Sequence, residues 1–222
     1  VEEPGDRFLI DVEELAQSNG SLIVLDETVT GFRLDLGGAQ AKFGLLPDLA
    51  CFGRGMANGY PISAVVGKRD IMELFPSTTS GEALSMAAAI ATIQEMRQAN
   101  VISHLWGQGR KLKDGYNTLA RYFGVAEYTQ CTGLAPRTAI IFNDEHGVDS
   151  PTFKTTFQQE CLKRGVLLSA CHNPGYSHSD QDIDHTLRVY RTVLEILGQA
   201  IGKSGVMDRS DGKPVEAVFS KG

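Results

Sequence analysis

Residues 21–33, SLIVLDETVTGFR, say more about the fold than any other stretch of this chain. After Ser21 the segment is continuously apolar up to Leu25, which is typical of a strand buried on both faces of a parallel sheet. The apolar run stops at Asp26 and Glu27, so two acids are expected at the carboxyl end of this strand. A short helix is predicted just before it, over 11–18, and a helix followed by such a strand predicts part of a βαβ unit.

Further strands and helices are predicted on both sides of a glycine-rich segment at 53–61. Apolar runs predict strands at 49–52, 62–66, 125–128, 137–142 and 166–168, and helical spacing predicts helices at 68–75, 81–100, 101–123, 152–164 and 180–200. We therefore predict an α/β fold in three parts. These are a partial large domain of mostly parallel sheet with its connecting helices (1–123), a smaller C-terminal α/β domain (124–201) and a polar tail (202–222).

Composition and charge narrow the class of protein. The chain has 222 residues, of which 42% are hydrophobic and 22% charged, as in an ordinary soluble globular protein. There is no apolar run of membrane-spanning length and no signal-peptide pattern, so we expect a cytoplasmic protein that does not contact membranes. A net charge of −6 without a cluster of Lys and Arg argues against nucleic acid as a partner. Neither the four cysteines nor the five histidines have metal-ligand spacing, so no metal site is expected.

The motif DETVTGFR at 26–33 resembles the strand-end motif of class III (fold type I) pyridoxal-phosphate aminotransferases, and in particular that of the glutamate-1-semialdehyde aminomutase branch. The likeness continues, in the family's order, through LGGAQ at 36–40, PDL at 47–49, GRG at 53–55, GYPISA at 59–64, TTSGE at 78–82 and HSDQDIDHTL at 178–187. It implies the type I fold of these transferases, pyridoxal 5'-phosphate (PLP) as cofactor and a small amino donor or acceptor as substrate. It also implies an active site that lies between two subunits.

The resemblance assigns roles to three polar residues. Asp26 matches the carboxylate that keeps the pyridine nitrogen of the cofactor protonated, so that the ring accepts the electron pair of a substrate carbanion. From its position alone, Asp26 is better explained as a helix cap or an ion-pair partner than as a functional residue. Thr28 matches the residue against the ring face, where members often have an apolar side chain. Thr78 matches the residue that binds the cofactor phosphate of the neighbouring subunit, and the alternative is a plain N-cap of the following helix.

Arg54 is the main departure from the family pattern. It occupies the position of the lysine whose amine forms a Schiff base with the cofactor and later carries the proton. A guanidinium stays protonated in proteins and is not an amine nucleophile, so Arg54 is not expected to form that bond. Lys42 and Lys68 are the neighbouring lysines, and neither is expected to replace it.

Two classes of function follow. The first is a PLP-dependent aminotransferase or aminomutase, acting on an amino acid, amino aldehyde or keto sugar, of which this chain is a fragment or a lysine-less variant. The second is a catalytically silent binding or structural subunit that pairs with a competent chain. An ordinary enzyme fragment in which Arg54 is an introduced change is a third possibility. In each case we expect a homodimer, or association with a chain that supplies the missing half of the fold.

Overall fold

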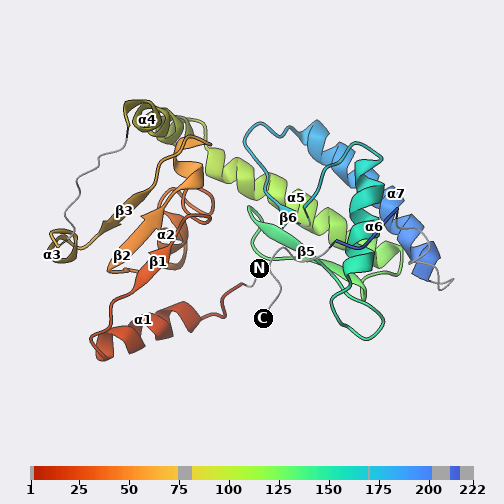
Figure 1. Cartoon of the computed structure of the whole chain (residues 1–222), viewed down its shortest axis with the longest axis horizontal. Coiled ribbons are helices and arrows are strands. Elements are labelled where there is room, and N and C mark those ends of the chain that lie inside the picture. The colour runs from red at the N-terminus through yellow and green to blue at the C-terminus, as the bar shows by residue number, and fades with distance from the viewer. Residues whose placement is uncertain (1–2, 75–81, 170, 202–210, 216–222) are drawn as a thin grey trace. The chain divides into compact units, whose positions relative to one another are not determined.

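The computed structural model describes residues 3–74, 82–169, 171–201 and 211–215, and the chain divides into two compact units. The first unit runs from Glu3 to His104 and the second from Leu105 onward. The division falls inside one long helix, α5 (Val101–Tyr122), whereas the sequence places both long connecting helices in the first part (Figure 1). Within the described residues, no helix is long and apolar enough to cross a membrane.

The first unit is a small sheet with helices around it. Its elements are α1 (Phe8–Ser18), β1 (Val24–Asp26), α2 (Gly38–Phe43), β2 (Leu49–Phe52), the 3₁₀ turn η1 (Arg54–Ala57), β3 (Ala64–Gly67), α3 (Arg69–Met72) and α4 (Ala83–Gln98). The strand order is β1-β2-β3, with β1 parallel and β3 antiparallel to β2. In the parallel pair Asp26 lies opposite Cys51, so the carboxyl ends of β1 and β2 meet at one edge of the sheet.

The predicted direction of β1 is confirmed, but its predicted burial on both faces is wrong. Val24 in the strand is 55% exposed, and Leu22 just before it is 61% exposed. The physical reason is that β1 is the outer strand of this sheet, and the described residues do not cover its apolar side chains. An apolar run therefore shows that a strand needs covering, and it does not show which residues cover it.

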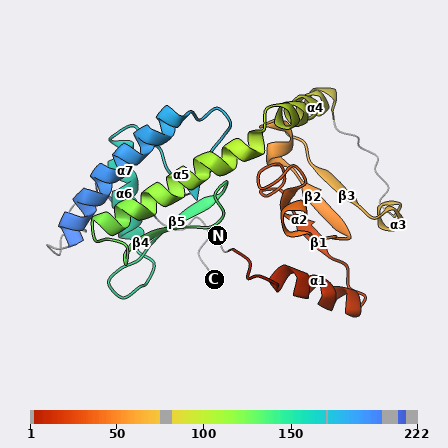
Figure 2. The same cartoon turned by 180° about the vertical axis from the view of Figure 1, so that it is seen from behind.

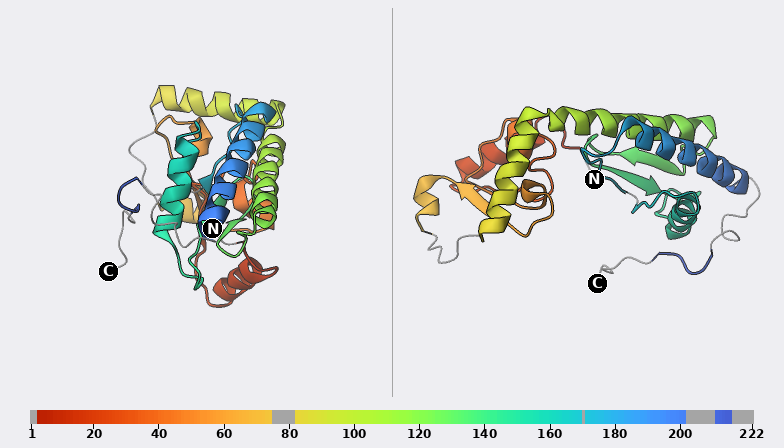
Figure 3. Two further views of the ribbon diagram at one scale, coloured as in Figure 1. Left: turned by 90° about the vertical axis from the view of Figure 1, so that its right-hand side faces the viewer. Right: turned by 90° about the horizontal axis from the view of Figure 1, so that it is seen from above.

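The second unit is a three-stranded antiparallel sheet with three helices gathered around it (Figure 3). Its strands are β4 (Thr129–Thr132), β5 (Thr138–Phe142) and β6 (Cys171–His172), and its helices are most of α5, α6 (Pro151–Leu162) and α7 (Asp180–Ile201). Helices α5 and α7 lie side by side (Figure 2). Four buried aromatic rings contact one another at the centre, and they come from every one of these helices and from β5: Tyr116, Phe142, Phe157 and Tyr190.

Two strand predictions in the second unit are wrong. The strand expected at 125–128 is found at 129–132, and the apolar run 166–168 is not a strand. In that run Val166 and Leu168 pack against the core, but Leu167 between them is 87% exposed. The side-chain amide of Gln158 donates to the carbonyl of Leu168 at 3.1 Å, which gives this backbone group a partner outside any sheet.

Candidate functional site

Asp26 ends β1 with its carboxylate exposed to solvent. Its Oδ1 accepts a hydrogen bond from the backbone N–H of Thr28 at 2.9 Å. The hydrogen bonds from the side chain and backbone of Thr28 lower the pKa of Asp26, and the positive charge of Arg54 lowers it further. The carboxylate is therefore ionised near neutral pH and remains open to a cationic partner.

Arg54 reaches the same edge of the sheet because β2 runs parallel to β1. β2 ends at Phe52, and Arg54 opens the 3₁₀ turn η1 that follows it. Gly53 between them is extended and lies close to Thr28, since a methyl group at Gly53 would be 3.9 Å from Cγ2 of Thr28. The structure thus brings Asp26, Thr28 and Arg54 together, although Arg54 is far from the other two in the sequence.

The backbone around this site is strained at two bulky residues. Arg54 has a φ angle of 39° and Phe32 one of 58°, in the left-handed region that residues with a branched or large side chain rarely adopt. Such a conformation costs on the order of 1–3 kcal/mol and persists where surrounding contacts fix it. Phe32 is fixed by packing edge-on against the ring of Phe52, at 5.7 Å between centroids. Strain of this kind is concentrated at functional sites in other proteins.

Glu27, next to Asp26, is buried and holds the start of α2 in place. It is only 1% exposed, and its carboxylate accepts hydrogen bonds from the N–H groups of Ala39 and Gln40 at 2.8 Å each. The hydroxyl of Thr30 donates a further bond to the same carboxylate. Gly38 adopts a φ of 79° against this carboxylate, where any side chain would collide with it. Glu27 therefore closes the loop after Asp26 onto the start of α2.

Of the two lysines considered in the sequence, Lys68 lies away from Arg54. Lys68 follows β3, and its Nζ pairs with Asp48 Oδ1 at 2.7 Å, next to the start of β2. That is the opposite end of the strand from Arg54. Lys42 lies in the last turn of α2. Thr78, the expected phosphate ligand, lies outside the described residues, and the helix that follows it is capped by Glu82, whose carboxylate accepts from the N–H groups of Leu84 and Ser85.

The C-terminal signature has a structural role in the second unit. The N–H and hydroxyl of Ser179 donate to Asp182 Oδ2 at 2.8 and 2.7 Å, and Asp182 N–H donates back to the hydroxyl at 3.3 Å. This reciprocal pair is a capping box that begins α7. His178 accepts a hydrogen bond from the N–H of Gly175 at 2.8 Å. Where the chain is described, no group of three or more His, Cys, Asp or Glu side chains is placed to hold a metal ion.

Sequence reasoning missed α2 and the anchoring of its start. The glycine pair at 37–38, which forms the N-cap and the first residue of α2, was the available signal, because a glycine at positive φ often marks a close approach of backbone and side chain. The partner, Glu27, lies more than ten residues earlier, so no local pattern connects the two.

Comparison with known proteins identifies the family. The family model for aminotransferase class III matches residues 1–192. The chain belongs to this family. Among curated class III relatives, the glutamate-1-semialdehyde 2,1-aminomutase of Desulfitobacterium hafniense (strain DSM 10664 / DCB-2) is 34% identical, over 88% of this chain and 49% of its own length. The enzyme of the same name from Thermomicrobium roseum is 32% identical, over 86% of this chain and 48% of its own.

Solved structures with a similar fold support this architecture. The FumI protein of Sphingopyxis sp. MTA144, solved in its PLP internal aldimine form, superposes with a TM-score of 0.77 at 27% identity, over 89% of this chain and 48% of that one. An omega-transaminase from Sphaerobacter thermophilus superposes with a TM-score of 0.78 at 20% identity, over 87% of this chain and 48% of that one, which supports the fold alone. The chain spans about half the length of the relatives it matches.

Proposed function

We propose that this chain forms the part of a class III aminotransferase or aminomutase that holds the pyridine ring of PLP. The observation that carries the proposal is the ionised, exposed carboxylate of Asp26 at the carboxyl end of a parallel strand, with Thr28 beside it. When bound, PLP supplies an electron sink for the carbanion of an amino substrate. Asp26 fits the protonated pyridine nitrogen of that cofactor by charge, and the Thr28 side chain provides a surface next to it.

The chain's residues fit PLP as a ligand held by ionic and hydrogen bonds, and they do not fit its covalent attachment at residue 54. The guanidinium of Arg54 stays protonated and contributes positive charge beside Asp26. We propose that it takes the anionic groups of the cofactor or of a substrate, a carboxylate or a phosphate, through paired N–H donors. Thr78 remains our proposed ligand for the cofactor phosphate, from a neighbouring subunit.

We propose an amino aldehyde, an amino acid or a keto sugar as the substrate, and the relatives named as aminomutases favour the amino aldehyde. We also propose a cytoplasmic location and a homodimer, or an assembly with a chain that supplies the other half of the fold. The second candidate is a silent subunit that binds PLP without turning over substrate. Arg54 favours it, because the amine nucleophile and proton carrier of the family are both absent from that position.

The first experiment measures PLP binding to the purified chain by equilibrium dialysis. Asp26→Asn removes the negative charge, so we expect the affinity for PLP to fall about tenfold or more, in line with the loss of one charged hydrogen bond. Asp70→Asn, an exposed acid on α3, is the matched control and should change nothing. Equal affinities for the unmodified chain and Asp26→Asn would overturn the proposed role of Asp26.

The second experiment separates the two candidate functions. Arg54→Lys restores an amine at the edge of the sheet next to Asp26. When a chain that supplies the other half of the fold is present, this variant should therefore give with PLP a yellow adduct that borohydride fixes on residue 54, as located by mass spectrometry. The unmodified chain should give none. If Arg54→Lys turns over substrate and the unmodified chain does not, the unmodified chain is a silent subunit. If both turn over substrate equally, the unmodified chain is an enzyme. A reducible adduct on Lys42 or Lys68 of the unmodified chain would contradict the proposed binding mode.

A further inference from the structure

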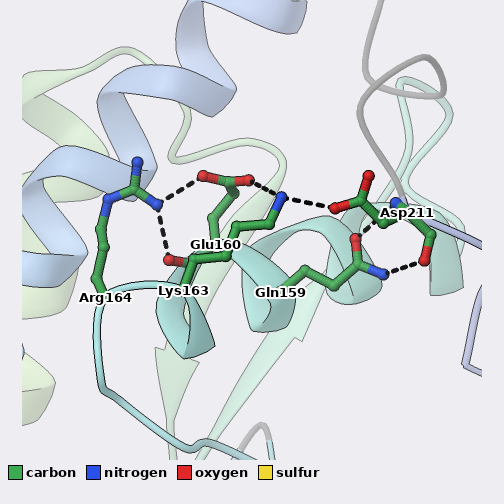
Figure 4. Close-up of polar contacts among 5 residues, drawn as sticks. All are labelled: Gln159, Glu160, Lys163, Arg164 and Asp211. Atoms are coloured by element: carbon green, nitrogen blue, oxygen red, sulfur yellow. Dashed lines mark hydrogen bonds and ion pairs between the residues drawn. The ribbon is translucent and has the colours of Figure 1, made fainter.

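Helix α6 carries a row of polar side chains that binds another part of the chain. Thr155, Gln159 and Lys163 follow one another at intervals of four residues, from within the helix to its C-cap, so they share one face. Residues 211–215, with the sequence DGKPV, lie along this row. Figure 4 shows the contacts at the end of the row where the segment begins.

The row recognises the backbone of the segment. The side-chain amide of Gln159 donates from Nε2 to the carbonyl of Asp211 at 2.9 Å, and its Oε1 accepts from the N–H of Asp211 at 2.9 Å. At the other end, the N–H of Val215 donates to the hydroxyl of Thr155 at 2.7 Å. That hydroxyl is fixed, because it also donates to the carbonyl of Pro151 at 2.7 Å and Thr155 is only 2% exposed.

The same row recognises an acidic side chain at the start of the segment. Lys163 Nζ lies 2.7 Å from Asp211 Oδ2 and 3.0 Å from Glu160 Oε1 (Figure 4). Arg164 holds Glu160 from the other side, at 2.6 Å. The hydrogen bond to Asp211 is the largest cause of the raised pKa of Lys163, followed by the bond to Glu160. The contacts with Glu160 and Asp211 thus hold the Lys163 ammonium next to the carboxylate of Asp211.

The segment is bent to fit the helix. Residues 211–213 form a bend, and Gly212 has a φ of 109°, in the left-handed region that favours glycine. The backbone groups of Asp211 and Val215 bond to Gln159 and Thr155, which lie one turn of α6 apart. That turn rises about 6 Å, whereas four fully extended steps would span about 13 Å. Because Asp211 lies by Gln159 and Lys163 while Val215 lies by Thr155, the segment runs antiparallel to α6. One bent stretch of five residues therefore contacts the whole row, from Thr155 to Lys163.

We propose that the row Thr155–Gln159–Lys163 is a docking surface for a short bent peptide with an acidic first residue, occupied here by residues 211–215 of the same chain. The occupant lies beyond residues 1–192, the part that the family model matches. The proposal goes beyond the function proposed above, since it involves neither Asp26 nor Arg54. Docking ties this segment to the second unit and covers the hydroxyl of Thr155.

The test measures hydrogen exchange of the full chain at the amides of Asp211 and Val215. Both should be protected. Gln159→Ala removes the paired bonds to Asp211, so the protection of both amides should fall about tenfold, the upper range for one net hydrogen bond. Thr155→Val keeps the side-chain shape and removes the acceptor for Val215, so the protection at Val215 should fall most. Lys163→Ala should have a smaller effect that disappears at high salt, where the exposed ion pair is screened.

Two controls match these changes. Thr186→Val removes a hydroxyl that likewise donates to a carbonyl one turn earlier, but on α7. Lys213→Ala changes an exposed side chain within the segment itself. Neither should alter exchange at 211 or 215, and protection of the Phe157 and Cys161 amides reports that α6 stays folded. The proposal is overturned if the two amides are unprotected in the unmodified chain, or if Gln159→Ala leaves them unchanged. Protection that rises with chain concentration would overturn the same-chain occupant and assign it to a second copy.

Discussion

The two units differ in how completely they enclose their apolar side chains. The second unit has one continuous core, in which Tyr116, Phe157 and Tyr190 are fully buried and Phe142 nearly so. The described core of the first unit is small and made mainly of Ala50, Phe52, Met56, Ala57 and Ala89. Several large apolar side chains of that unit are exposed instead, among them Phe8, Leu15, Leu22, Val24, Leu84 and Ile90.

This difference separates stability from function. The candidate cofactor residues Asp26, Thr28 and Arg54 all lie in the less enclosed unit, at a sheet edge. The burial of apolar area is the main source of folding free energy. The second unit buries more large apolar side chains, so we expect it to be the more stable of the two. We expect the first unit to gain stability only when its exposed apolar faces are covered in the proposed assembly.

The largest expected effect concerns the core of the second unit. Phe157→Ala empties a fully buried aromatic site and should lower the free energy of unfolding of this unit by about 3–5 kcal/mol. Phe8→Ala on α1, where the ring is 62% exposed, should cost less than about 0.5 kcal/mol. Urea unfolding followed by hydrogen exchange in each unit measures both. A large loss of unfolding free energy for Phe8→Ala would mean that α1 is packed against other residues and that the first unit encloses its apolar side chains better than stated above.

Acid should destabilise the second unit through His172. Burial lowers the pKa of this ring from 6.5 to about 4, and both its nitrogens lie 2.8 Å from hydroxyls, those of Thr138 and Tyr190. Between pH 6.5 and about 4, His172 binds a proton in the unfolded chain but stays neutral in the folded unit. The stability is therefore fully present above pH 6.5 and falls as the pH drops towards 4, by about 3 kcal/mol in total.

Urea unfolding at a series of pH values checks this slope in the second unit. His172→Gln should flatten it, whatever that variant does to stability at neutral pH. His185→Gln, at an exposed position of α7, should leave the slope intact. A slope that survives His172→Gln would assign the acid sensitivity to other groups.

In the first unit, Glu27 should be the most costly polar side chain to change. Glu27→Gln places an amide group where a carboxylate accepts from two backbone N–H groups and a hydroxyl, so we expect a loss of about 2 kcal/mol. Hydrogen exchange should accelerate at Ala39 and Gln40. Glu73→Gln, on an exposed surface pair with Arg69, is the control and should have almost no effect. Unchanged exchange at 39 and 40 would show that Glu27 does not anchor the loop.

The smallest expected effect concerns the start of α7. Ser179→Ala removes one half of the capping box with Asp182 and should lower the stability of the second unit by about 1 kcal/mol. Ser177→Ala, two residues earlier at an exposed position, should be neutral. Equal values for the two serines, measured by urea unfolding, would remove the structural explanation of the C-terminal signature.

Elements fixed by interactions between nearby residues could be predicted from the sequence, and elements fixed by residues far apart in the sequence could not. The last helix was predicted at 180–200 and is found at 180–201, because its caps and its apolar spacing are local. α2 was missed because its start depends on Glu27, and β6 because Cys171 and His172 pair with a distant strand. At the site, the acid at the end of β1 was expected, while the left-handed backbone of Arg54 was not, since no residue type there signals it.

The parallel pairing of β1 and β2 also governs how the chain can change in length. Asp26 and Arg54 are brought together by the register of two short strands, so residues added between α2 and β2, around Gly44 to Leu46, would leave both in place. One residue inserted between Cys51 and Gly53 would instead shift everything after it by about 3.3 Å and reverse the side of the sheet it faces. Natural insertions and deletions should therefore collect in the first stretch and be absent from the second.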